Sequence, residues 1–127
     1  MDESFTKEER LCSKKIIQNL FEKGSSFVIY PFRIFWFETE LETRYSVQIL
    51  INVSKKSFPN AVDRNKIKRQ IREVYRKNKN ILYEHLDNKG KQYALSFIYT
   101  AKDKAGFKEM ETKIILSLQR LIKEIEV

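Results

Sequence analysis

Five cationic side chains and one asparagine could share a single helical face in the middle of the chain. They fall on one arc if residues 60–79 are helical at about 100° per residue. This set, called the basic arc below, consists of Arg64, Asn65, Lys68, Arg69, Arg72 and Arg76. Four of the five cations are arginines, whose planar guanidinium donates two parallel hydrogen bonds to a phosphate and stays charged at any usable pH. The set therefore favours the binding of phosphate groups.

Charge of one sign repeats at i,i+4 spacing along the basic arc. The residues at this spacing are Arg64, Lys68, Arg72 and Arg76. A helix face that is merely solvated normally mixes the two signs through i,i+4 pairs, and like charges this close repel one another. Segregated positive charge is the electrostatic footprint of a polyanionic partner. We prefer that interpretation to an ordinary solvated face.

The excess charge of the whole protein is concentrated around this helix. Residues 55–79 contain ten Lys or Arg and two acidic residues, a net charge of +8, which equals the net charge of all 127 residues. Lys55 and Lys56 lie just before the helix and extend the positive region. Lys66 and Lys77, on another face beside Glu73, are interpreted as ordinary solvated charge.

Protein-based hydrolysis of a phosphodiester would need paired histidines, a carboxylate cluster or a similar set of groups. The chain has one histidine, His85, and one cysteine, Cys12. We expect His85 at the surface and Cys12 as a small buried residue. The acidic residues are dispersed, and there is no phosphate loop or Cys/His zinc spacing. We therefore predict no catalytic residue and no metal site on the polypeptide.

Helical periodicity predicts three helices. The central one is expected from about Asn60, a suitable N-cap, to Lys79, with Ile67, Ile71, Val74 and Tyr75 on its apolar side. A first helix is expected to start at Thr6 or at Ser13 and to end near Lys23, followed by Gly24. A last helix is expected to run to about Glu126, and residues 80–92 are expected to be a frayed helix end and a loop. The apolar positions of the last helix are Met110, Ile114, Leu118, Leu121, Ile122 and Ile125.

Alternating apolar residues predict strands at 27–37, 45–54 and 93–100. An acidic hairpin at 38–43 would join the first two. The residues expected to face the core are Val28, Tyr30, Phe32, Ile34 and Trp36; Tyr45, Val47, Ile49, Ile51 and Val53; and Tyr93, Leu95, Phe97 and Tyr99.

The order α-β-β-α-β-α predicts an α+β fold with helices packed on a small, mainly antiparallel sheet, in one domain covering residues 1–127. A split of the first strand would add a fourth. No apolar run approaches the ~20 residues needed to span a bilayer, and the acidic, polar N-terminus predicts no signal peptide. A single cysteine excludes an internal disulfide, which fits a reducing cytoplasm.

A second polar and aromatic surface is predicted on the non-core face of the sheet. Aromatic rings beside a cation suit single-stranded nucleic acid, because bases stack on the rings and the cation binds the backbone. The residues are Arg33, Phe35, Phe37, Gln48 and Asn52, with Phe21 from the first helix. Burial of Phe35 and Phe37 under another layer is an equal alternative, and core packing is preferred for Phe21.

The run AVDRNKIKRQIREVYR closely resembles the signature of the bacterial ribonuclease P protein subunit. The match is long and ungapped, and Val-Ser-Lys-Lys precedes it as in that family. The matching residues are Val53, Ser54, Lys55, Lys56, Ala61, Val62, Arg64, Asn65, Lys68, Arg69, Arg72 and Glu73. Lys66 stands where the family usually has Arg, Asn60 where Gly is frequent, and Gln48 and Leu50 where Arg and Gly are usual.

The resemblance implies a ribosomal-protein-like fold with a left-handed βαβ crossover. It implies an endoribonuclease complex, a hydrolase, that removes the 5′ leader of precursor tRNA, with catalysis by an RNA subunit that uses Mg²⁺. The implied RNA-binding residues are Lys55, Lys56, Arg64, Asn65, Lys68, Arg69 and Arg72, with Arg76 added on physical grounds. The implied leader cleft contains Phe21, Arg33, Phe35 and Asn52.

Two other functions fit the same basic helix. A generic RNA- or DNA-binding module, for instance a ribosome-associated protein, would use it without a catalytic RNA. A membrane-surface helix is disfavoured, because the apolar side is narrow and is needed to cover the sheet. The resemblance implies the catalytic RNA and precursor tRNA as partners, and we expect no membrane and no DNA.

Overall fold

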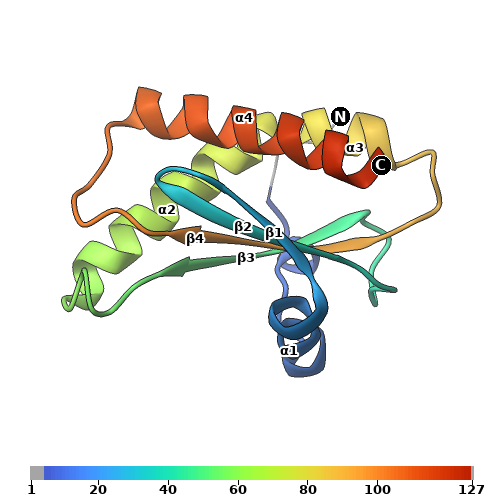
Figure 1. The fold of residues 1–127 in the computed structure, drawn as a ribbon, viewed down its shortest axis with the longest axis horizontal. Helices are drawn as coiled ribbons and strands as arrows, with labels where there is room; N and C mark the ends of the chain where they lie inside the picture. The colour runs from blue at the N-terminus through green and yellow to red at the C-terminus, as the bar shows by residue number, and fades with distance from the viewer. Residues whose placement is uncertain (1–4, 127) are drawn as a thin grey trace.

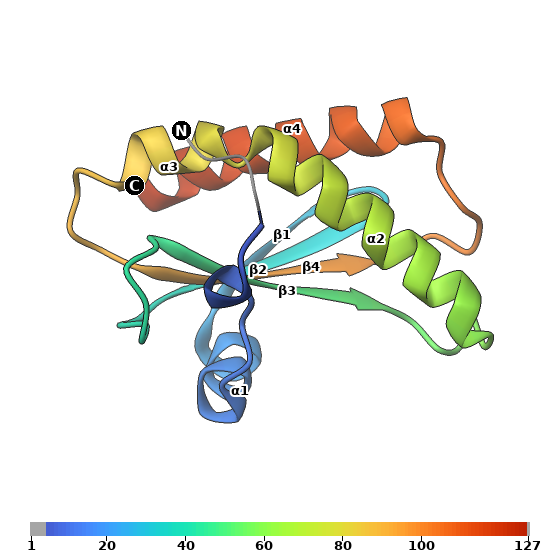
Figure 2. The same ribbon diagram turned by 180° about the vertical axis from the view of Figure 1, so that it is seen from behind.

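The chain forms a four-stranded sheet with helices on both faces (Figure 1). The computed structural model describes residues 5–126. Helix α1 lies on one face, and α2, α3 and α4 lie on the other, as the reverse view also shows (Figure 2). The elements are η1 (Lys7–Glu9), α1 (Lys14–Lys23), β1 (Ser25–Ile29), β2 (Phe32–Glu38), β3 (Val47–Val53), α2 (Ala61–Asn78), α3 (Asn80–Leu86), β4 (Tyr93–Tyr99) and α4 (Phe107–Glu126).

The sheet has the strand order β1-β2-β4-β3. Strands β1, β2 and β4 pair antiparallel, and β3 pairs parallel to β4. The α+β class with a small, mainly antiparallel sheet is therefore confirmed. The left-handed sense of the connection from β3 through α2 to β4 stays a prediction from the resemblance.

Residues 38–43 were predicted to join the strands before and after them, β2 and β3, as a hairpin. This prediction is wrong, because β4 lies between β2 and β3 in the sheet. The connection is fastened instead to Gln92, which precedes β4. The Leu41 N–H donates to Gln92 Oε1 at 2.8 Å, and Gln92 Nε2 donates to the carbonyl oxygens of Thr43 and Tyr45 at 2.8 and 2.9 Å. One glutamine side chain thus holds the link that crosses the end of the sheet.

The first predicted strand is two strands, β1 and β2, which reverse direction at Tyr30 and Pro31. The fourth strand that such a split would add is confirmed. The predicted core face is wrong in β1, because the reversal pairs Phe27 with Ile34, and residues paired across antiparallel strands share a face. Phe27 is therefore buried, whereas Val28 and Tyr30 are each 62% exposed.

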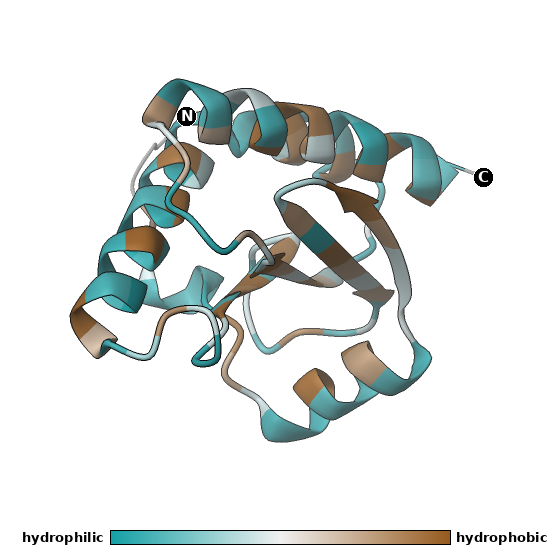
Figure 3. Ribbon diagram, turned by 60° about the vertical axis from the view of Figure 1, so that its left-hand side comes forward, coloured by the Kyte–Doolittle hydropathy of each residue, from teal (hydrophilic) through white to brown (hydrophobic). Residues whose placement is uncertain are grey.

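Two apolar layers hold the helices to the sheet. The larger lies between the sheet and α2, α3 and α4, and includes the predicted inward residues of β3, β4 and α4. The smaller lies under α1, where Leu11, Leu20 and Ala94 are buried and Phe35 and Phe37 pack partly buried against them. Figure 3 shows the largely hydrophobic strands and the alternating hydrophilic and hydrophobic turns of the helices.

Both predicted N-caps of the first helix are used, by different elements. Ser13 caps α1, its Oγ accepting from the Ile16 N–H at 3.3 Å, while Thr6 precedes η1 and its N–H donates to Glu9 Oε1 at 2.9 Å. Gly24 ends α1 in an extended conformation, so its role is close approach: a Cβ there would lie 2.3 Å from the Leu20 carbonyl oxygen and 2.8 Å from that of Trp36.

The prediction of a frayed helix end and a loop at residues 80–92 is wrong for the first half of that segment. Helix α3 occupies Asn80–Leu86 and buries Leu82, Tyr83 and Leu86 against the larger layer. Only Lys79 separates α3 from α2, so the apolar spacing in the sequence looks like a continuation of α2. His85 is accordingly in a packed helix, with Nε2 2.8 Å from Glu126 Oε1.

Candidate nucleic-acid interface

Helix α2 presents the basic arc because its other side is fixed in the core. Asn60 caps the helix, its Oδ1 accepting from the Val62 N–H at 2.9 Å, as predicted. The apolar side is fully buried, at Ile67, Ile71, Val74 and Tyr75. Because α2 packs on the larger layer and lies beside the edge strand β3, the arc is held at that edge of the sheet.

Three cations of the arc have no carboxylate within salt-bridge distance among residues 5–126: Lys68, Arg69 and Arg72. Burial and the positive charges of Arg10 and Arg69 lower the pKa of the Arg72 guanidinium. Burial is the larger cause of this shift, and the repulsion from Arg10 and Arg69 acts in the same direction. Asn65 is exposed between them. This is the part of the arc that a phosphate backbone could neutralise.

Arg64 positions the loop that precedes the helix. Its Nη1 donates to the carbonyl oxygens of Phe58 and Pro59 at 2.9 and 2.8 Å. These bonds fix the chain between β3 and α2, the segment that carries the exposed Lys55 and Lys56. A guanidinium has five N–H donors, so Arg64 keeps donors for a ligand beyond this contact.

Arg76 departs from the prediction, because the protein supplies a counter-charge of its own. Its Nη2 lies 2.7 Å from Glu73 Oε1, and its Nε donates to Glu73 Oε2 at 3.1 Å. The hydrogen bond and charge of Arg76 lower the pKa of the Glu73 carboxyl. Glu73 is therefore the ion-pair partner of Arg76, which the sequence analysis did not predict, and Arg76 is the weakest member of the arc.

Arg10 lies beside the basic arc, which no pattern in the sequence predicted. The segment after η1 runs beside β3, with Arg10 bridged to Ile49 and the Leu11 N–H donating to the Ile49 carbonyl oxygen at 2.9 Å. A pocket of about 170 Å³ lies where this segment, β3 and α2 meet. It is lined by Phe5, Arg10, Leu11, Cys12, Ile49, Leu50, Ile51, Lys68 and Arg72.

The position of Arg10 in the sequence explains why it was not predicted as part of the interface. Arg10 is more than fifty residues from α2 in sequence and lies outside any helical or strand periodicity. The prediction that Cys12 is buried is also wrong, because Cys12 is exposed at the same pocket. Long-range contacts, among them the parallel bridge to Ile49, bring this segment to the arc.

The predicted cleft residues lie in two adjacent rows across the α1 face of the sheet. Strand pairing aligns Arg33, Ile98 and Asn52 in one row, and Phe35, Ser96 and Leu50 in the next. Helix α1 covers the second row, while Arg33 is exposed and Asn52 is half-buried. The structure therefore brings Arg33, Phe35 and Asn52 onto one surface.

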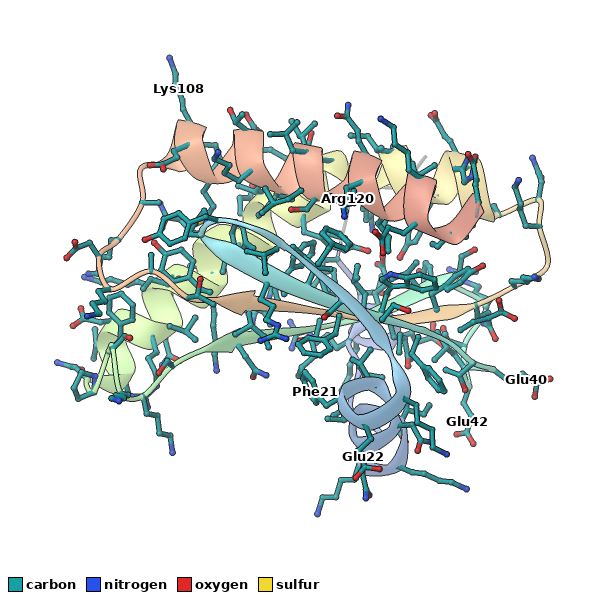
Figure 4. All side chains as sticks on the ribbon, viewed as in Figure 1. Phe21, Glu22, Glu40, Glu42, Lys108 and Arg120 are labelled. Carbon is teal, nitrogen blue, oxygen red and sulfur yellow. The ribbon has the colours of Figure 1, made fainter. Side chains whose placement is uncertain are left out.

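Aromatic contacts connect α1 to this surface. The Arg33 guanidinium carbon lies 5.1 Å from the centroid of the Phe35 ring, and the Phe35 and Phe21 centroids are 5.0 Å apart in an edge-on arrangement. Phe21 is 36% exposed and lies on the side of α1 nearest the sheet (Figure 4). Phe35 and Phe37 are half-buried and pack against the layer under α1, so the alternative of burial holds in part, and their place in a cleft stays a prediction.

Lys79 is the one cation of the 55–79 stretch that is buried. Its Nζ lies 2.9 Å from Glu9 Oε2, and the Tyr83 hydroxyl donates to the same oxygen at 2.6 Å. Burial would raise the pKa of the Glu9 carboxyl, but hydrogen bonds from Tyr83, Thr6 and Lys79 outweigh it, and the pKa lies below its ordinary value. This pair fixes η1 to the end of α2 and serves the fold.

The protein-family model for ribonuclease P matches residues 5–126, nearly the whole chain. The chain belongs to the ribonuclease P protein family. Among curated proteins it is 34% identical over 117 residues to the ribonuclease P protein component of Porphyromonas gingivalis, covering 91% of this chain and 85% of that one. It is 48% identical over 67 residues to that of Chlorobaculum tepidum, covering 50% of this chain and 44% of that one.

Solved ribonuclease P proteins share the fold. The structure from Thermotoga maritima aligns with a TM-score of 0.69 and 25% identity, covering 88% of this chain and 96% of that one. The structure from Staphylococcus aureus aligns with a TM-score of 0.67 and 27% identity, covering 91% and 99%. Membership in the ribonuclease P family identifies the chain as a ribonuclease P protein component, and the family implies a role in tRNA processing.

Within the described part of this ribonuclease P protein, residues 5–126, no three His, Cys, Asp or Glu side chains cluster as metal ligands would. No helix in the same range has the length and apolar character needed to cross a membrane. The predictions of no catalytic residue and no metal site stay predictions.

Proposed function

We propose that this chain is the protein subunit of a ribonuclease P holoenzyme and that its basic arc binds the catalytic RNA. The observation that carries the proposal is the row of Lys68, Arg69 and Arg72 on one edge of α2, with no carboxylate of residues 5–126 within salt-bridge distance. RNA phosphates are the counter-charge that this row lacks. Asn65 adds an amide, and Lys55 and Lys56 extend the positive region along the preceding loop.

The α1 face of the sheet would bind the single-stranded 5′ leader of precursor tRNA. Arg33 lies against the Phe35 ring, and Asn52 is in the same row as Arg33. A cation, an aromatic ring and an amide are therefore close together on the partly exposed part of this face. Bases stack on aromatic rings with little regard to identity, which suits leaders of varied sequence. Phe21, edge-on to Phe35, would form the wall of this cleft.

Cleavage of the leader would be carried out by the RNA subunit with Mg²⁺ that the RNA binds. The protein would contribute substrate affinity through the cleft and neutralise RNA phosphates through the basic arc. Protein cations that neutralise phosphates reduce the need for free Mg²⁺ to do so. Rescue of cleavage at low Mg²⁺ is therefore the expected signature of the protein subunit.

Reconstitution tests this function. Precursor tRNA is incubated at low Mg²⁺ with a bacterial ribonuclease P RNA, alone or with the protein, and 5′-leader release is measured. The wild-type protein should rescue cleavage, and a Lys68→Ala, Arg69→Ala, Arg72→Ala variant should not. Binding of the RNA without rescue would instead favour a generic RNA-binding or ribosome-associated module.

A further inference from the structure

A second groove lies on the flank of α2 that faces the start of α4. It has a volume of about 430 Å³ and is lined by Lys66, Arg69, Gln70, Glu73, Lys104 and Phe107. Its volume is within the range of sites that hold a small organic molecule. The cleft described above lies on the α1 face of the sheet, on the other side of the molecule, so this groove is a separate surface.

The charge of the groove selects an anion. Lys66 and Arg69 are exposed and have no carboxylate within salt-bridge distance among the described residues. Two acids beside the groove are already paired: Glu73 binds Arg76 at 2.7 Å, and Asp63 binds Lys104 at 3.1 Å. Two cations therefore remain uncompensated at the groove wall.

The aromatic ring of Phe107 forms another wall of the groove and is not packed in either buried layer. Phe107, the first residue of α4, is 38% exposed and is absent from both buried layers. The Lys77 ammonium lies 5.5 Å from the centroid of its ring. An exposed ring beside uncompensated cations is the arrangement on which an unpaired base stacks while its phosphate is neutralised.

We propose that this groove is a nucleotide-binding subsite for an unpaired nucleotide of the RNA partner, with its base on Phe107 and its phosphate on Lys66 and Arg69. Arg69 is shared between the basic arc and the groove, so RNA that crosses the arc reaches the groove without a gap. This proposal rests on the RNA-binding role of the basic arc. It adds that the groove between α2 and the start of α4 binds an unpaired nucleotide.

A fluorescence titration tests the subsite directly. Phe107→Trp places a reporter on the groove, and Leu116→Trp places a matched one on α4 at a position 44% exposed that does not line the groove. Each variant is titrated with the single-stranded oligonucleotide rA8 at low salt. Stacking should quench the reporter at position 107 and leave the one at 116 unchanged. Equal quenching, or none at 107, overturns the subsite.

Affinity measurements separate this subsite from the basic arc. Phe107→Ala should weaken binding of rA8 about fivefold or more, the loss of one stacked base, with the salt dependence unchanged. Leu116→Ala is the control for removing an exposed apolar residue of α4. If Phe107→Ala binds like wild type while Arg72→Ala binds weakly, the subsite is wrong and the arc stands. If neither variant loses affinity, both are wrong.

Discussion

At the scale of single residues, the cations of this protein differ in what neutralises them. Lys79 is buried on Glu9, Arg76 is bridged to Glu73, and Arg64 donates to backbone carbonyls. Lys68, Arg69 and Arg72 have no acidic partner among residues 5–126. The second group should dominate RNA binding, because an existing ion pair must be broken before its cation is available.

Glu73→Gln should strengthen RNA binding. The substitution removes the charge that holds Arg76, so the guanidinium joins the arc and the slope of log affinity against log salt should steepen by ~1. Filter binding of a bacterial ribonuclease P RNA over a salt series measures this slope. The same substitution in an Arg76→Ala background should give much less gain. An equal gain in both backgrounds would mean that Glu73 acts only through long-range charge.

Glu9→Gln should destabilise the fold strongly. The carboxylate is fully buried against Lys79, and removing one partner of a buried pair leaves an uncompensated charge that costs about 3–5 kcal/mol. Urea denaturation measures the free energy of unfolding. Glu22→Gln, at an exposed carboxylate that accepts a hydrogen bond from Gln18, should stay within about 0.5 kcal/mol of wild type. Similar losses of unfolding free energy in the two variants would contradict the stabilising role of the buried Glu9–Lys79 pair.

The same carboxyl predicts a pH dependence. Because the folded-state pKa of Glu9 lies below its ordinary value of 4.5, its contribution is fully present above that value. The contribution should be lost as the pH falls below about 4.5 and through the folded-state pKa. Unfolding free energies measured from pH 6 to pH 3 should show this loss in wild type and a shallower decline in Glu9→Gln. Parallel declines would contradict it.

At the scale of elements, the periodic segments could be predicted from the sequence. Helices α2 and α4 and the inward faces of β3 and β4 follow from apolar spacing alone, because each buries one continuous side. The basic arc follows from the same spacing. Helix α3 could not be separated from α2, since its apolar residues continue the helical pattern after Lys79.

The features that could not be predicted from the sequence depend on pairing between segments that are distant in the chain. Alternation in residues 27–37 continues through the reversal at Tyr30 and Pro31, so the inward face of β1 was assigned to the wrong residues. The hairpin prediction failed because β4, fifty residues later, inserts between β2 and β3. Arg10 reaches the interface through long-range contacts such as its bridge to Ile49. None of these contacts leaves a local pattern.

Gly24→Ala should test how α1 is joined to the sheet. A Cβ at this position would lie 2.3 Å from the Leu20 carbonyl oxygen, so the end of α1 must shift, at a cost of about 1–3 kcal/mol. Thermal unfolding followed by circular dichroism measures the change. Gly106→Ala is the control, because nothing lies within 4 Å of its added Cβ. Equal melting temperatures for the two variants would show that α1 accommodates the methyl group.

At the scale of the whole molecule, the two predicted RNA surfaces lie on opposite faces of the sheet. The basic arc belongs to the layer of α2 and α4, and the leader cleft belongs to the face that carries α1 (Figures 1 and 2). They meet at the edge strand β3, where the pocket that contains Arg10 also holds Leu50, Lys68 and Arg72. One protein could thus contact the catalytic RNA and the leader together across this edge.

Salt-dependent binding of a bacterial ribonuclease P RNA tests the central claim, that unpaired cations on α2 bind RNA phosphates, most directly. The affinities of wild type and of the Lys68→Ala, Arg69→Ala, Arg72→Ala variant are measured from low to moderate salt. The slope of log affinity against log salt should become shallower by about 2–3 in the variant, one phosphate contact for each cation removed. An unchanged slope, in a variant that melts like wild type, would contradict the account.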